Sequence, residues 1–134
     1  MSNCHSYKLK EMGFEEGQKR CKVIKIDSKQ SWDIFMYHAK NQARPIVIHF
    51  TASWCIPSVA MAPVIAELAL SYQNILFLSV DVDEVKEVAA EMEIKAMPTF
   101  MFMRDGVEVV DKLVGANPEE IRNRIAAAFI NSTT

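Results

Sequence analysis

The sequence predicts a single α/β domain in which a central mixed sheet is flanked by helices. Three observations support this fold class: the 134 residues suit one domain, half of them are hydrophobic, and apolar runs typical of buried strands alternate with segments of helical periodicity. The expected order is β-α-β-α-β-α-β-β-α. Residues 1–20 lack apolar periodicity and are expected to form a flexible N-terminal extension, and residues 21–134 to form the domain.

The first half of the domain contains two expected strands around a helix. The β-branched run at residues 22–27 predicts a strand. Ser31 is the expected N-cap of the helix that follows. The apolar face of this helix repeats at i, i+3, i+4 and i+7, and consists of Trp32, Phe35, Met36 and Ala39. The near-continuous apolar run at residues 45–51 predicts a strand that is covered on both faces.

The middle of the chain is expected to be a kinked helix, a strand and a short helix. A helix opens near Cys55, and Pro63 should kink it because proline cannot donate a backbone hydrogen bond. Residues 75–81 predict another buried strand. Apolar residues between positions 85 and 92 then repeat at helical spacing.

The last part of the chain predicts a hairpin and a terminal helix. Residues 99–103 and 107–113 are the expected antiparallel strands, and the turn signal at residues 104–106 joins them. Asn117 is the expected cap of the final helix, and Pro118 occupies its first position.

Charge and composition exclude several classes of partner. The net charge of −2 provides no basic field for nucleic acid, and no apolar run is long enough to span a membrane. The polar N-terminus lacks the centre of a secretory signal, and three cysteines are too few for a disulfide framework. We therefore expect a cytosolic monomer. His5 and His38 have no metal-ligand spacing to the cysteines, so no metal and no resident cofactor are expected.

Cys55 is the cysteine expected to react. It follows a buried strand and stands where a helix begins, so the positive end of the helix dipole stabilises its thiolate. Pro57 is compatible with the first turn of that helix. Trp54 offers an apolar platform for a protein substrate. A buried, inert thiol is the alternative, but the Trp-Cys-x-Pro context at a strand-to-helix junction favours a nucleophile.

The chain from about residue 22 to residue 129 resembles thioredoxin. The markers are Phe-Thr-Ala-Ser-Trp-Cys-Ile-Pro-Ser at 50–58, Val-Asp-Val-Asp at 80–83, Lys-Ala-Met-Pro-Thr-Phe at 95–100 and Val-Gly-Ala-Asn at 114–117. Among thioredoxins it is most similar to plant proteins related to the h type that carry C-x-x-S in place of C-x-x-C. The resemblance implies a thioredoxin fold.

The resemblance also implies the roles of several residues. Cys55 would be the attacking cysteine, and the Met97–Pro98 bond beside it would be cis, although the local sequence alone favours trans. Gly115 suits a surface that another backbone approaches closely. The implied surface for binding protein substrates consists of Trp54, Ile56, Pro57, Met97, Pro98, Val114, Gly115 and Ala116.

Two residues depart from the usual thioredoxin pattern. Ser58 stands in place of the resolving cysteine, and we expect its hydroxyl to donate a hydrogen bond to the Cys55 thiolate; the alternatives are an inert filler or an engineered replacement. His49 stands in place of a buried aspartate. It is either a structural neutral residue, which we favour, or a general base acting through water.

A single thiol favours disulfide isomerisation over reduction. Cys55 can form a mixed disulfide, but release needs another thiol, from the client or from glutathione. We therefore expect a thiol–disulfide oxidoreductase with mainly protein disulfide isomerase activity and weak reductase activity. One alternative is a binding module that forms stable mixed disulfides with clients. Another is a reductase that uses Cys4 as its resolving thiol, whereas Cys21 lies at the start of the first expected strand.

Overall fold

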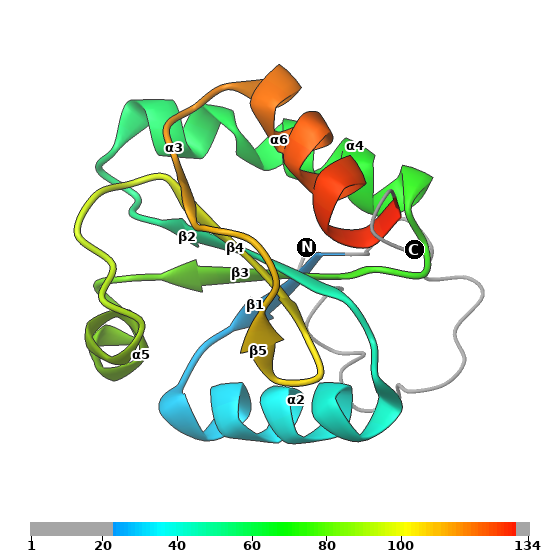
Figure 1. The fold of residues 1–134 in the computed structure, drawn as a ribbon. Coiled ribbons are helices and arrows are strands. Elements are labelled where there is room, and N and C mark those ends of the chain that lie inside the picture. The colour runs from blue at the N-terminus through cyan, green and yellow to red at the C-terminus, as the bar shows by residue number, and fades with distance from the viewer. Residues whose placement is uncertain (1–22, 131–134) are drawn as a thin grey trace.

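A six-stranded mixed sheet separates two layers of helices in the computed structural model, which describes residues 23–130 (Figure 1). The strands are β1 (Val23–Ile26), β2 (Ile46–Thr51), β3 (Leu76–Asp81), β4 (Thr99–Arg104), β5 (Val107–Glu108) and β6 (Leu113–Val114). The helices are α2 (Lys29–Gln42), α3 (Ile56–Ala60), α4 (Ala62–Ser71), α5 (Lys86–Glu91), α6 (Pro118–Ile125) and the π-helical turn η2 (Ala126–Ile130). The α/β class and the expected order of elements are confirmed, with three elements subdivided: the helix after Cys55, the last strand and the final helix. The expected extension at 1–20 lies outside the described residues.

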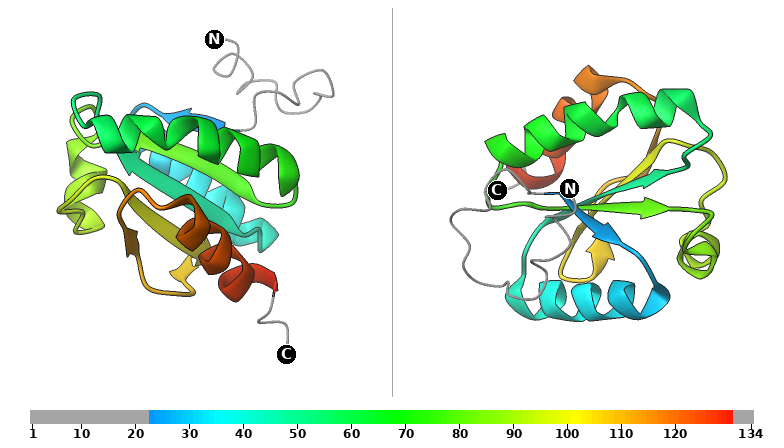
Figure 2. Two further views of the ribbon diagram at one scale, coloured as in Figure 1. Left: turned by 90° about the horizontal axis from the view of Figure 1, so that it is seen from above. Right: turned by 180° about the vertical axis from the view of Figure 1, so that it is seen from behind.

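The sheet places β2 near its middle. The strand order is β1-β3-β2-β4-β5, and β6 also pairs with β4. β1, β3 and β2 are parallel, whereas β4 is antiparallel to β2. The two further views show α4 and α6 together over one face of the sheet and α2 across the other (Figure 2). β2 ends at Thr51, and the segment that carries Cys55 follows directly.

Side-chain alternation along β2 divides the core into two parts. Ile48 and Phe50 belong to the apolar cluster that contains residues of α2 and α5, whereas Val47 belongs to the cluster that contains residues of α4 and α6. Because successive side chains of a strand point to opposite faces, His49 and Thr51 share the face of Val47. Both therefore lie on the side of the sheet that α3 and α4 cover.

Helix α2 begins earlier than the sequence predicts. Ser28, with an extended backbone at φ −163°, is the N-cap, and its side chain accepts a hydrogen bond from the Ser31 backbone N–H at 3.1 Å. Ser31 lies inside the helix, and its hydroxyl donates to Asp27. The prediction of Ser31 as the N-cap was wrong. It placed the cap directly before Trp32, the first residue of the apolar face, but the first turn of a helix needs no apolar residue, and α2 begins at Lys29.

The edge strand expected at residues 107–113 is divided into β5 and β6. The Val109 N–H still donates to Phe102 O at 2.9 Å, but Val110 then packs against the core. The carbonyl of Asp111 accepts a hydrogen bond of 2.7 Å from Arg124. Residues 110–112 thus leave the ladder between β5 and β6, both of which pair with β4.

The kink expected at Pro63 is a break between α3 and α4. Met61 joins the two helices, and Pro63 lies in the first turn of α4, where its missing N–H removes no helical bond. The cap of α6 is confirmed, because Asn117 accepts hydrogen bonds from the N–H groups of Glu119 and Glu120. None of the helices within residues 23–130 is long and apolar enough to cross a membrane.

Candidate active site

Cys55 is the N-cap of α3 and carries a free thiol that is half-buried. Its carbonyl accepts hydrogen bonds from the N–H groups of Ser58 and Val59, both at 3.0 Å, and its own N–H donates to Ala52 O. The thiol donates to the Met97 carbonyl at 3.5 Å. The backbone thus holds the sulfur at the junction of β2 and α3, next to the segment that precedes β4.

The segments that the resemblance singles out meet around this sulfur. The Met97–Pro98 bond is cis, as the resemblance implies, and the trans bond favoured by the local sequence is not found. The Pro98 carbonyl accepts a hydrogen bond from Gly115 N–H at 3.0 Å, and Val114 pairs with Thr99 in the sheet. These contacts bring residues 97–98 next to residues 114–115. The hydrogen bond from the Cys55 thiol to the Met97 carbonyl places both segments beside Cys55.

An exposed apolar surface surrounds the thiol, and we call it the docking surface. The largest exposed fractions are 78% for Ile56, 64% for Trp54 and 60% for Val114. Its members are the substrate-binding residues expected from the sequence, without Pro98, which is buried: Trp54, Ile56, Pro57, Met97, Val114, Gly115 and Ala116. Val59, which is 48% exposed, was missed; it follows Ile56 by three positions, so helical spacing would have placed it on the same face.

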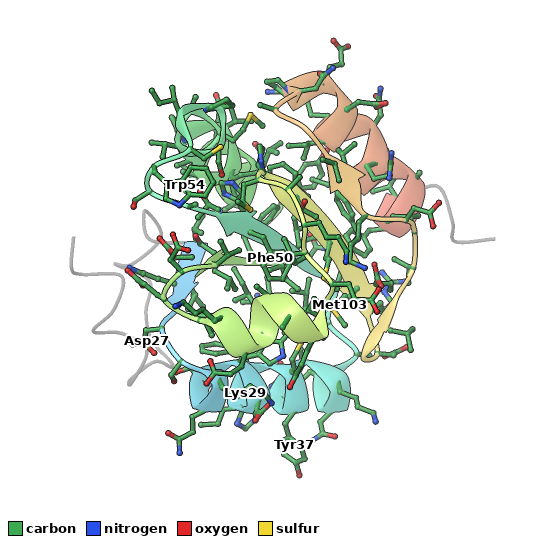
Figure 3. The ribbon with its side chains drawn as sticks, turned by 90° about the vertical axis from the view of Figure 1, so that its left-hand side faces the viewer. Asp27, Lys29, Tyr37, Phe50, Trp54 and Met103 are labelled. Atoms are coloured by element: carbon green, nitrogen blue, oxygen red, sulfur yellow. The ribbon has the colours of Figure 1, made fainter. Side chains whose placement is uncertain are left out.

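Asp83 holds the Trp54 ring. The indole Nε1–H donates to Asp83 Oδ2 at 2.8 Å, and Asp81 Oδ1 in turn accepts the N–H groups of Asp83 and Glu84. Figure 3 shows Trp54 at the margin of the fold, in contrast to Phe50 near its centre. Residues 80–83 were expected only as a family marker, and the contact of Asp83 with Trp54 was missed.

Ser58 makes its side-chain hydrogen bonds away from Cys55. It is fully buried, and its hydroxyl donates to Thr51 Oγ1 at 2.6 Å. The same oxygen lies 3.3 Å from His49 Nε2. The expected bond from Ser58 to Cys55 is not formed, because the sheet beneath α3 presents two better-placed partners. We call His49, Thr51 and Ser58 the polar cluster; His49 and Ser58 are buried, and Thr51 is half-buried.

His49 is a neutral residue in this cluster. Its side chain is 3% exposed, and burial lowers the pKa of His49 from 6.5 to about 4. The ring stacks on Phe100, with centroids 4.8 Å apart. At neutral pH the imidazole therefore carries no charge. The donor and acceptor roles in the contact between His49 Nε2 and Ser58 depend on the imidazole tautomer.

The remaining candidates lie elsewhere. Cys4 and Cys21 lie outside the described residues, so the resolving thiol proposed for Cys4 stays a prediction. His38 is exposed on α2, where Tyr37 contacts it edge-on. Within residues 23–130 no group of three or more His, Cys, Asp or Glu side chains could hold a metal ion.

Comparisons with known proteins agree with the fold. The thioredoxin family model matches residues 22–127. The chain is 61% identical to the thioredoxin-like protein CXXS1 of Arabidopsis thaliana over 84% of this chain and 93% of that protein. It is 46% identical to an h-type thioredoxin of Oryza sativa subsp. indica, over 85% and 89% of the two chains.

Solved structures show the same relationship. A poplar thioredoxin h mutant superposes with a TM-score of 0.78 at 42% identity, covering 84% of this chain and 86% of that chain. Thioredoxin NaTrxh of Nicotiana alata superposes with a TM-score of 0.76 at 36% identity, covering 80% and 92%. With the family's fold, a free thiol at a helix start and an apolar surface around it, the chain belongs to the thioredoxin family of thiol–disulfide oxidoreductases, which act on proteins that contain disulfides.

Proposed function

We propose that this thioredoxin-family protein is mainly a protein disulfide isomerase, with only weak disulfide reductase activity. The observation that carries the proposal is the pair formed by Cys55 and Ser58: a half-buried thiol at the start of α3 and, three residues later, a fully buried hydroxyl where a second thiol would complete a dithiol site.

The isomerase cycle needs only the Cys55 sulfur and the sulfurs of the client. The Cys55 thiolate attacks one sulfur of a client disulfide, a mixed disulfide forms, and the other client sulfur leaves as a thiolate. That thiolate attacks a second client disulfide and exposes another client thiolate. When a client thiolate attacks the mixed disulfide, Cys55 leaves as a thiolate. One S–S bond forms for each one that breaks, so no electrons are gained or lost.

Net reduction is slower because this chain lacks the second thiol at position 58. The Ser58 hydroxyl cannot form an S–S bond, and its hydrogen bonds already join Thr51 and His49. Release of a reduced client then requires an external thiol, for which we propose glutathione. We propose the cytosol, whose thiols are kept reduced, as the compartment, and a monomer as the working form.

The site residues divide into three roles in this proposal. Cys55 is the nucleophile, and the docking surface binds the client polypeptide through exposed apolar side chains. Met97 adjoins both, because its carbonyl accepts the thiol hydrogen bond. His49 acts as a neutral structural residue rather than a general base, since its ring is bonded to Ser58 and stacked on Phe100.

Reactivation of scrambled ribonuclease tests the proposal. Wild-type protein should restore ribonuclease activity, and Cys55→Ala should not. A Cys55→Ala variant that still reactivates ribonuclease would overturn it. Binding of clients that survives in Cys55→Ala, together with no reactivation by wild type, would instead favour the client-binding module. Reduction of insulin that is lost in Cys4→Ser would favour Cys4 as a resolving thiol.

A further inference from the structure

We infer that Thr51 and Ser58 form a positioning contact that holds the start of α3, and with it Cys55, against the sheet. Neither comparison nor motif assigns Thr51 a role. The inference deepens the proposed function, on which its relevance to client exchange rests. It also changes the role of Ser58, from a donor to the reactive sulfur to the anchor of the helix that carries it.

Helix α3 has one buried side chain, that of Ser58, with which to attach to the fold. The helix has only five residues, and Ser58 is the one among them that is buried. The others, at positions 56, 57, 59 and 60, are exposed. A helix this short is not stable by itself, so its position depends on tertiary contacts. Its large apolar side chains, Ile56 and Val59, are 78% and 48% exposed, so we take the buried polar side chain of Ser58 as the anchor within α3.

Besides Ser58, the start of α3 is supported by the Cys55 thiol, which donates a hydrogen bond of 3.5 Å to the Met97 carbonyl. Cys55, its N-cap, makes no side-chain capping hydrogen bond, and Pro57 has no backbone N–H to contribute. The carbonyl of Cys55 accepts the N–H groups of Ser58 and Val59. If Ser58 is displaced, its N–H therefore moves relative to the Cys55 carbonyl, and the orientation of Cys55 changes.

Thr51, the partner of Ser58, is held in the sheet by its pairing with β3. Thr51 is the last residue of β2, where it is registered opposite Asp81 of β3, and its carbonyl accepts the Val82 N–H at 2.9 Å. The Ser58 hydroxyl reaches Thr51 Oγ1 at 2.6 Å, the shorter of its two bonds in the cluster. The contact thus joins the five-residue helix that begins at Cys55 to the carboxyl end of β2, a strand with neighbours on both sides.

The consequence concerns the reactivity of Cys55. When α3 is held, its first turn and the Met97 carbonyl keep a fixed relation to the sulfur. When the anchor is removed, α3 moves relative to the sheet, and the sulfur loses this fixed position. Thr51 acts through Ser58 and does not touch the client.

The test compares matched variants in the full-length chain. Thr51→Val removes the hydroxyl and keeps the shape, Thr51→Ser keeps the hydroxyl, and Ser58→Ala removes the other partner. Alkylation of Cys55 by iodoacetamide is followed across pH by mass spectrometry of the peptide that contains it, so that Cys4 and Cys21 do not interfere. The titratable neighbours on these strands, His49 and Asp81, are the same in every variant. The measurement needs no client, so its outcome is separate from that of the isomerase assay.

We expect Thr51→Val to slow Cys55 alkylation at neutral pH by about twofold to tenfold, the range that one net hydrogen bond represents. Thr51→Ser should react like wild type. The double variant Thr51→Val/Ser58→Ala should be no slower than Ser58→Ala alone, because both changes remove the same contact.

Three results would overturn the inference. One is a slowing in Ser58→Ala with none in Thr51→Val, which would make Ser58 a direct donor to Cys55. Another is additive slowing in the double variant. The third is a Thr51→Val protein that loses thermal stability while its alkylation rate and pH profile stay unchanged, which would make the contact merely structural.

Discussion

The indole nitrogen of Trp54 lies 2.8 Å from a carboxylate oxygen of Asp83, although the two residues are 29 positions apart. The bond joins the segment before α3 to the loop after β3. Asp83 is itself held by the side chain of Asp81, which accepts its N–H. The exposed ring of Trp54 is thus fixed at its polar edge, which leaves its apolar face available for a client.

Loss of this bond should weaken client binding without changing the thiol. In Asp83→Ala the ring of Trp54 is free to turn, and we expect KM for a disulfide-containing client to rise about fivefold, equivalent to about 1 kcal/mol. The rate of Cys55 alkylation should stay at the wild-type value. Asp83→Asn keeps an oxygen acceptor and serves as the control. Equal KM values for all three proteins would show that the bond does not orient the platform.

Burial of His49 should make the stability of the protein depend on pH. The pKa of His49 is about 4 in the folded state and 6.5 as an ordinary value, so between these values the unfolded state binds more protons. The free energy of unfolding should therefore rise with pH through this window. It should fall by about 3 kcal/mol when the pH is lowered from above 6.5 to about 4.

Urea unfolding of wild type and His49→Gln at several pH values measures this contribution. Glutamine keeps a hydrogen-bonding nitrogen but does not titrate, so the pH dependence of the difference between the two proteins reports His49. A difference that stays constant from pH 4 to pH 7 would contradict a neutral, buried His49.

The docking surface should contribute to client exchange through its exposed apolar side chains. Ile56→Ser should lower kcat/KM for a protein disulfide by about threefold to tenfold, since burying such a side chain is worth about 1 kcal/mol or more. Ile34→Ser is the matched control, because Ile34 is 53% exposed on α2, which covers the other face of the sheet. The same loss in both variants would mean that Ile56 has no special part in binding.

A second thiol at position 58 should convert the site towards reduction. In Ser58→Cys the new sulfur follows Cys55 by one helical turn and can attack the mixed disulfide within the same molecule. Insulin reduction should rise by at least about tenfold, given the effective concentrations of intramolecular reactions. Unchanged reduction would show that the absent thiol is not what limits this protein.

Sequence patterns predicted most of the fold because its signals are local. The apolar run at 45–51 and the cap at Asn117 each depend on a few neighbouring residues, and both match the structure. The hairpin edge differed because Val110 packs on the core and Arg124 takes the carbonyl of Asp111, two contacts that no period-2 pattern contains.

The sequence predicted the reactive cysteine and the apolar surface around it, but not the hydrogen bonds of the site. Cys55 and Trp54 could be identified from the strand-to-helix junction and the family pattern. The partners of Ser58 and Trp54 could not, because Thr51 and Asp83 reach them only after β2, β3 and α3 have packed. The spacing of His49 and Thr51, two residues apart on one strand, was the one available clue that both face α3.

The most direct test of the isomerase account counts turnovers. Reduced protein is added in substoichiometric amount to scrambled ribonuclease with no other thiol present, and both the recovered ribonuclease activity and the total free thiols are followed. The account predicts several native ribonuclease molecules per Cys55 at a constant total of free thiols. Recovery that stops at one molecule or fewer per Cys55, with Cys55 held in a mixed disulfide, would contradict it.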